Sequence, residues 1–150
     1  MLTLDEIINI TKERPFCLFL GAGISKEAGL PLGDEMGQMI LTALGASEDY
    51  AKILNKKFHL ERMMMFLKNI IGEKIYGAYS AVLDVENWGR NHKILALLSA
   101  EKNVPLLTTN QDELIEKSIN SSKSLVNILK IHGTLSNQES LAITLDRVSK

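Results

Sequence analysis

A buried apolar run that ends directly in a glycine turn constrains the fold of this chain more than any other segment. Residues 16–20 (FCLFL) are continuously apolar and lie between Pro15 and Gly21. A short apolar run with these borders is typical of a strand that is buried on both faces. The sequence GAGIS at 21–25 follows at once, and such a turn leads into a helix in many α/β proteins. We therefore expect an α/β fold that begins with this strand.

Later apolar segments indicate the size of the sheet. Residues 104–108 and 125–131 predict a second and a third strand, and residues 141–145 predict a short fourth one. A helix is expected over residues 111–120. We therefore expect a Rossmann-like parallel sheet of three or four strands.

The segment between the first two strands carries helical signals instead of strand signals. Its apolar residues recur at helical spacing, which predicts a helical insertion of about four helices. Residues 1–150 then form one domain. Within it, residues 1–44 and 101–150 make the α/β core and residues 45–100 make the insertion.

The overall composition excludes several classes of protein. The 150 residues carry 17 Lys and Arg against 18 Asp and Glu, so no basic excess indicates nucleic-acid binding. The single cysteine, Cys17, excludes an intrachain disulfide and a multi-thiolate zinc site, and we expect no metal. No apolar run approaches the ~20 residues that span a bilayer. The first residues, MLTLDEIINITKERP, begin with a capping box and predict an amphipathic helix instead of a secretory signal. We expect a cytoplasmic protein without membrane contact.

The glycine turn has the residues that a pyrophosphate site needs. Gly21 permits a sharp turn, and Gly23 has no Cβ to keep backbone N–H groups away from phosphate oxygens. A helix N-terminus after the turn would add about half a positive charge. A tight strand-to-helix turn without a ligand has the same residues, and this segment alone does not separate the two interpretations.

Two distant segments end the other strands with residues that carry chemistry. The sequence TTNQD follows the second strand at 108–112, and IHGT ends the third at 131–134. The carboxyl ends of parallel strands open on one edge of the sheet, where α/β proteins bind ligands. We therefore expect the glycine turn, Asn110, Asp112 and His132 to converge. The alternatives are a helix N-cap for Asn110 and a structural histidine for His132.

The order GAGIS at 21–25, AGLP at 28–31, TNQD at 109–112 and HG at 132–133 resembles the sirtuin family. In that family the matching segments are GAGxS, Q-N-x-D and H-G, and the resemblance covers nearly the whole chain. It implies a Rossmann-like core that binds NAD as a substrate and cleaves the nicotinamide–ribose bond. The helical insertion is similar to the smaller module of the family.

Departures from the family pattern narrow the implied activity. The residues LGD stand at 32–34 in place of a Phe-Arg pair, Thr109 replaces the usual Gln, and the zinc cysteines of most deacylases are missing. The chain looks more like bacterial sirtuin-like domains that hydrolyse NAD in antiphage defence. We therefore expect an NAD glycohydrolase, with an NAD-dependent protein deacylase and a non-catalytic NAD or ADP-ribose sensor as alternatives. The family's later strands would follow Lys150, so we expect a truncated core that belongs to a homo-oligomer or a longer multidomain protein.

The resemblance also assigns roles to single residues. It implies that Asn110 holds a ribose hydroxyl or a water. His132 is the expected general base, because an imidazole titrates near neutrality. Asp112 would contact the nicotinamide amide or stabilise the local turn. The expected NAD-binding residues are Gly21, Ala22, Gly23, Ser25, Thr109 and Asp112. His59 and His92 lack partners at ligand spacing, and we expect solvent-facing or capping roles for them.

Overall fold

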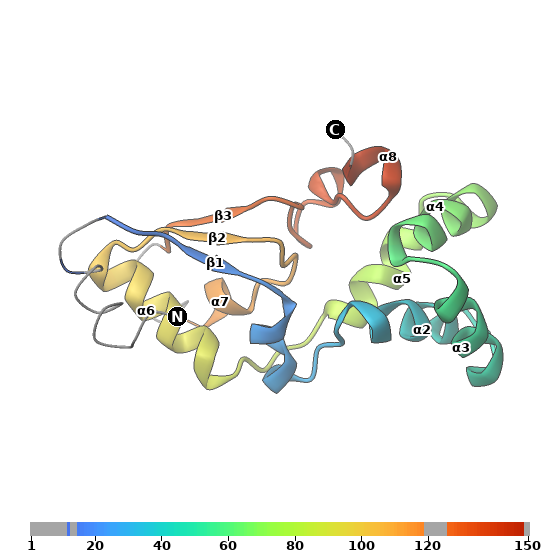
Figure 1. The fold of residues 1–150 in the computed structure, drawn as a ribbon, viewed down its shortest axis with the longest axis horizontal. Coiled ribbons are helices and arrows are strands. Elements are labelled where there is room, and N and C mark those ends of the chain that lie inside the picture. The colour runs from blue at the N-terminus through green and yellow to red at the C-terminus, as the bar shows by residue number, and fades with distance from the viewer. Residues whose placement is uncertain (1–11, 13–14, 119–125, 149–150) are drawn as a thin grey trace, which may run out of the picture.

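The computed structural model describes residues 12, 15–118 and 126–148, and within these ranges three short strands form one sheet (Figure 1). The strands are β1 (Leu18–Leu20), β2 (Leu106–Thr108) and β3 (Ile128–Lys130). They pair in parallel in the order β1-β2-β3. The predicted α/β class and the parallel sheet are therefore confirmed, with strands shorter than the apolar runs that predict them.

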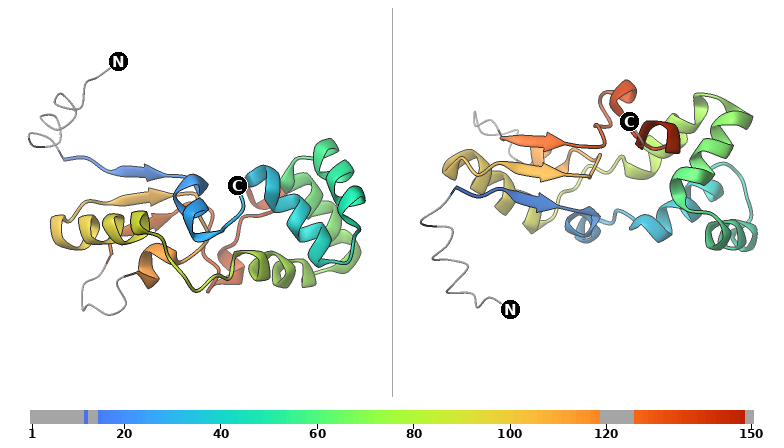
Figure 2. Two further views of the ribbon diagram at one scale, coloured as in Figure 1. Left: turned by 90° about the horizontal axis from the view of Figure 1, so that it is seen from below. Right: turned by 45° about the horizontal axis from the view of Figure 1, so that its top comes forward.

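The carboxyl ends of the three strands lie at one edge of the sheet, because the strands are parallel. Figure 2 shows their arrowheads directed toward the helical part of the molecule. The segments that begin at Gly21, Thr109 and Ile131 therefore leave the sheet on the same edge.

Two helices cover one face of the sheet and lie below it in Figure 1. They are α6 (Arg90–Lys102) and α7 (Leu114–Lys117). Successive side chains of a strand point to opposite faces. Leu20 and Leu106, which face the helices, form a buried cluster with Ala96 of α6 and Ile115 of α7. On the opposite face the side chains of Phe19 and Leu129 are exposed.

The predicted helical insertion is present between β1 and β2 as a group of four helices. These are α2 (Gly33–Ala43), α3 (Glu48–Lys57), α4 (Leu60–Ile71) and α5 (Lys74–Leu83). Helix α2 packs on the other three, and Ile40, Met64 and Tyr76 are buried in a cluster that α2, α4 and α5 share. By packing, α2 belongs to this group although residues up to 44 were expected in the core. Helix α6 packs instead on α7 and on the segment after β1. The domain assignment itself stays a prediction.

A 3-10 helix, η1 (Ala22–Ala28), connects β1 to the helical group. It ends at Gly29, whose φ of 88° lies in the left-handed region that glycine enters without steric cost. Pro31 is buried two residues later, and α2 begins at Gly33. The glycine turn therefore leads into a short helical segment that delivers the chain to the helical group.

The predicted fourth strand at 141–145 is wrong. Residues 141–143 pair with no strand of the described chain. They lie between η2 (Gln138–Ser140) and α8 (Leu145–Val148). Leu141 and Ile143 are buried against the helical group. The alternating apolar pattern therefore comes from an extended segment that packs on helices. The period of the pattern alone does not distinguish such a segment from a strand of a sheet.

The helix predicted over 111–120 is shorter than expected, because α7 begins at Leu114. The Asp112 Oδ1 atom accepts a hydrogen bond at 3.2 Å from the N–H of Leu114, the first residue of the helix. The predicted amphipathic helix near Thr3 and the loop at 121–123 lie outside the described residues.

Candidate functional site

A cavity of about 220 Å³ lies between the carboxyl edge of the sheet and the helical group. One wall is polar and comes from η1 and from the segments that follow β2 and β3. The other wall is apolar and comes from α2, α4, α5 and the turn before α2. Its side chains include Leu30, Met36, Leu60 and Leu83. The segments after all three strands therefore reach one cavity.

Most of the site residues expected from the sequence line this cavity. They are Ala22, Ser25, Thr109, Asn110, Asp112 and His132. Gly21, which precedes η1, and Gly23, in its first turn, are exposed and lie outside the lining. A Cβ placed at either glycine would meet no atom within 4 Å, and neither has a positive φ. Packing and backbone conformation therefore do not require glycine at these positions. The close approach of a ligand remains our prediction for why glycine is present there.

Ser25 is the centre of a buried hydrogen-bond network behind the polar wall. Its hydroxyl donates to Asp112 Oδ2 at 2.9 Å, accepts from Asn110 Nδ2 at 3.1 Å and lies 3.1 Å from His92 Nε2. A hydroxyl has one proton and two lone pairs, so these three contacts use its full capacity. A contact between this side chain and a phosphate would therefore require the network to open.

Asn110 brings one carboxamide to the cavity. Its backbone N–H donates to Thr108 Oγ1 at 3.0 Å, and its Nδ2 donates to Ser25 and, at 3.3 Å, to Asp112. The Oδ1 atom is buried and has no hydrogen-bond partner among the described residues. A buried acceptor without a partner costs about 1–3 kcal/mol. Because α7 begins only at Leu114, Asn110 is not its N-cap.

Asp112 stabilises the turn between β2 and α7. It is buried, and its carboxylate accepts from Ser25, from Asn110 and from the Leu114 N–H. The structure therefore shows the second of the two roles expected for this residue. Its contact with nicotinamide stays a prediction.

His132 is half-buried at the cavity, and its segment is held by the backbone. Its carbonyl accepts from Gln111 Nε2 at 2.9 Å and from the Ala142 N–H at 3.0 Å. Gly133 has a φ of 82°, and a Cβ there would collide with the Ser140 backbone. Within the described ranges the imidazole makes no hydrogen bond to the protein, so its ring nitrogens are available to a ligand or water.

Gln111 and Tyr79 belong to the site but were not expected from the sequence. The Tyr79 hydroxyl donates to Gln111 Oε1, and Gln111 Nε2 in turn donates to the His132 carbonyl. Burial raises the pKa of Tyr79, so the phenol is a neutral donor. These bonds connect α5 to the segments after β2 and β3. Gln111 lies inside the TNQD motif, whereas nothing but helical periodicity marks Tyr79.

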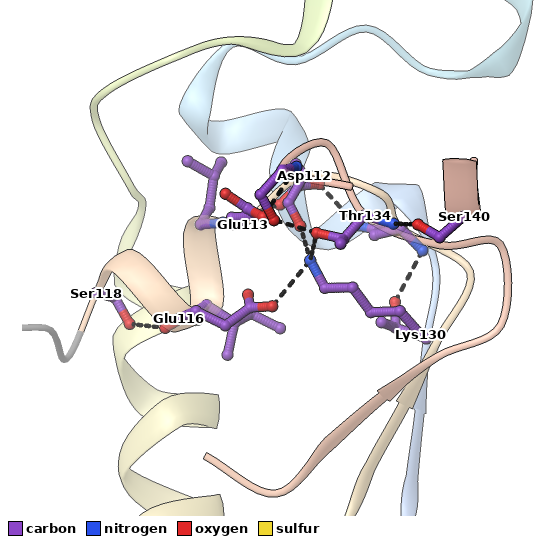
Figure 3. Close-up of polar contacts among 12 residues, drawn as sticks. Asp112, Glu113, Glu116, Ser118, Lys130, Thr134 and Ser140 are labelled. Atoms are coloured by element: carbon purple, nitrogen blue, oxygen red, sulfur yellow. Dashed lines mark hydrogen bonds and ion pairs between the residues drawn. The ribbon is translucent and has the colours of Figure 1, made fainter. Parts of the chain in front are cut away.

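Lys130 supports the polar wall from behind, where β3 ends (Figure 3). Its Nζ lies 2.9 Å from Glu116 Oε1, donates to the Asp112 carbonyl and donates to Thr134 Oγ1 at 3.4 Å. The Lys130 side chain is only 10% exposed. One ammonium group therefore links α7, the turn around Asp112 and the segment after β3.

Glu113 adds a second link in the same place. Its Oε1 accepts from Thr134 Oγ1 at 2.7 Å and from the Ser136 N–H at 3.2 Å. Partial burial acts to raise the pKa of Glu113, but the hydrogen bonds from Ser136 and Thr134 outweigh it and lower the pKa. The carboxylate form of Glu113 is therefore the form that the fold stabilises.

His92 is fully buried at the start of α6, so the expectation of a solvent-facing side chain is wrong and the capping alternative is confirmed. Its Nδ1 accepts the Gly89 N–H at 3.0 Å. Burial lowers the pKa of His92, and the carboxylates of Asp112 and Glu27 act against this shift without reversing it. The spacing of Gly89 and His92 is that of a capping box, which was the available sequence signal.

Two comparisons with known proteins identify no relative of this chain. A scan against known protein families finds no match, and a search of the curated proteins finds none either. No helix in the described ranges is both long and apolar enough to cross a membrane. Across the same ranges, no three His, Cys, Asp or Glu side chains are grouped as a metal site would need.

Proposed function

We propose that the cavity binds the nicotinamide–ribose end of NAD and that the protein hydrolyses the bond between nicotinamide and ribose. The observation that carries the proposal is that Asn110, whose Oδ1 is buried and unpartnered, lines the same cavity as His132. An acceptor in that position favours a ligand that presents a hydroxyl or an ordered water. Ribose hydroxyls and an attacking water are such donors.

The two side chains divide the chemistry between them. Nicotinamide leaves as a neutral pyridine, so the main barrier is the positive charge that develops on the ribose. Asn110 orients a ribose hydroxyl or the water and places a carbonyl dipole near that charge. His132 accepts a proton as the water oxygen bonds to C1′, while the C1′–N bond breaks and its electron pair goes to nicotinamide. The products are nicotinamide and ADP-ribose.

The size of the cavity supports binding of one end of the dinucleotide. Ligand pockets commonly measure roughly 300–1,000 Å³, and this cavity measures about 220 Å³. The apolar wall suits the flat nicotinamide ring, and the polar wall suits its ribose. The diphosphate would then lie along the exposed turn at Gly21 and Gly23, where added side chains would meet open space.

Nicotinamide release from NAD tests the proposal directly. We expect the purified chain to release nicotinamide, and we expect Asn110→Ala and His132→Ala each to lower the rate by about 100-fold or more, the range for a lost preorganised dipole and for a lost acid–base group, respectively. His59→Ala is the matched control, because His59 is an exposed histidine at the start of α4, outside this cavity.

Three results would contradict the hydrolase assignment. Full rates in both Asn110→Ala and His132→Ala would remove the assigned roles. Thermal stabilisation by NAD without turnover would favour the sensor, and release of acetyl-ADP-ribose from an acetyl-lysine peptide would favour the deacylase. A role in bacterial antiphage defence is part of the same proposal and depends on the hydrolase result.

A further inference from the structure

A basic hollow lies at the carboxyl end of α3, at the end of the helical group away from the sheet (Figure 1). It measures about 490 Å³, and the side chains that line it include Lys52, Lys56, Lys57 and Phe58. None of the described side chains in its lining is a carboxylate, and it shares no lining residue with the cavity described above. Ligand sites commonly measure roughly 300–1,000 Å³, so the basic hollow has room for a ligand group of its own.

The charges of α3 are separated along its length. Glu48 and Asp49 lie in its first turn, and Lys56 and Lys57 lie in its last turn. Lys52, Lys56 and Lys57 are exposed, and among the described residues no ion pair involves any of them. The nearly balanced charge of the whole chain therefore does not describe this surface, which presents three ammonium groups to solvent.

Helix stability explains only part of this arrangement. Lysines in the last turn of a helix stabilise its dipole, which accounts for Lys56 and Lys57. It does not account for Lys52, one turn earlier, or for Phe58, whose side chain is 42% exposed beside the lysines. An exposed aromatic ring among cations is the arrangement by which proteins bind single-stranded nucleic acid, because bases stack on the ring while the cations pair with phosphates.

We propose that the basic hollow binds a segment of single-stranded nucleic acid, with one base stacked on Phe58 and the adjoining phosphates paired with the lysines. Lys52 and Lys56 lie one turn apart on α3, where Cβ atoms are about 5–6 Å apart, so they can contact two phosphates of one strand. A base inside a duplex is stacked on its neighbours and is not available to Phe58. This binding site is separate from the proposed hydrolysis of NAD and does not depend on it.

Fluorescence anisotropy of a labelled single-stranded DNA of about 12 nucleotides, titrated with the purified chain, measures this binding. Between about 50 and 200 mM salt, three lysine–phosphate contacts predict a slope of about −2 for the logarithm of the association constant against the logarithm of salt concentration. Lys56→Gln removes one contact and should change this slope to about −1.4. Phe58→Leu should weaken binding by about 5-fold or more without changing the slope, as for the loss of one stacked base.

Matched substitutions elsewhere on the surface are the controls. Lys93→Gln removes an exposed lysine of α6, and Phe66→Leu changes a phenylalanine of α4 that is 63% exposed and lies outside the basic hollow. Neither should change the affinity or the slope. Circular dichroism and urea midpoints check that each variant is folded. If Phe58→Leu does not fold, the comparison of Lys56→Gln with Lys93→Gln decides.

The inference is overturned if the strand does not bind at about 50 mM salt, or if Lys56→Gln and Lys93→Gln weaken binding equally. Wild-type affinity in folded Phe58→Leu also overturns it. Three competitors test the choice of ligand. Displacement of the strand by ATP at an equal phosphate concentration would assign the basic hollow to free nucleotides instead, and equally tight binding of a duplex would assign it to phosphates alone. Tighter binding to phosphatidylserine vesicles would assign it to a membrane surface.

Discussion

Replacing Lys130 by Met tests the idea that one ammonium group holds the polar wall together. Its Nζ lies 2.9 Å from Glu116 Oε1, and the two side chains are 10% and 31% exposed. Opposite unit charges at this distance attract by about 6 kcal/mol at an effective dielectric constant of about 20. Desolvation of the two groups offsets much of that attraction.

Loss of one partner from a buried ion pair costs about 3–5 kcal/mol. Glu116 keeps partial contact with water, so we expect Lys130→Met to lower the free energy of unfolding by about 2–3 kcal/mol. The Asp112 carbonyl also loses its donor. For a chain of this length, the expected fall in Tm is about 4–12 °C.

Urea unfolding followed by circular dichroism measures the effect, and a second ion pair of the same chain is the control. Lys117 lies 3.8 Å from Asp84 Oδ1, and their side chains are 35% and 72% exposed. Lys117→Met should change stability by about 0–1 kcal/mol. If Lys130→Met is no more destabilising than Lys117→Met, the reasoning is refuted. A double variant, Lys130→Met with Glu116→Leu, should recover part of the loss, because no charge is then left unpaired.

Two further predictions concern the links around the cavity. Tyr79→Phe leaves Gln111 Oε1 without its donor and should lower the free energy of unfolding by about 1–3 kcal/mol in urea titrations, whereas Tyr50→Phe, at an exposed position, should have no effect. Glu113 has a lowered pKa in the fold, because hydrogen bonds outweigh the opposing effect of burial. Its contribution to stability is therefore present above the ordinary pKa of 4.5 and lost as pH falls below that value. Acid titration should destabilise the wild-type chain more than Glu113→Gln, and equal curves would contradict this assignment.

The sequence predicted the parts of the site that depend on strand direction. Once three buried strands are taken as parallel, their carboxyl ends share an edge, and Ser25, Asn110 and His132 follow those ends. All three line one cavity in the structure. The roles of these residues stay predictions, and so does the resemblance to sirtuins.

Other parts of the site depend on contacts between residues that are distant in the chain. His92 and Ser25 are separated by 67 positions, and Tyr79 and Gln111 by 32. Neither local periodicity nor a short motif reports such a pair. The apolar alternation at 141–145 predicted a strand for a related reason. The alternation indicates which side chains are buried but not whether a sheet or a group of helices covers them.

Local chemistry in the sequence determined the α/β class, the parallel strands and the edge where the polar motifs gather, because apolar runs and glycine turns act over a few neighbouring residues. Tertiary structure alone decided which hydrogen-bonding groups face one another. The Asn110 amide nitrogen donates to Ser25 and to Asp112, and Ser25 also contacts His92. These contacts exist only after α6, η1 and the segment following β2 have packed together.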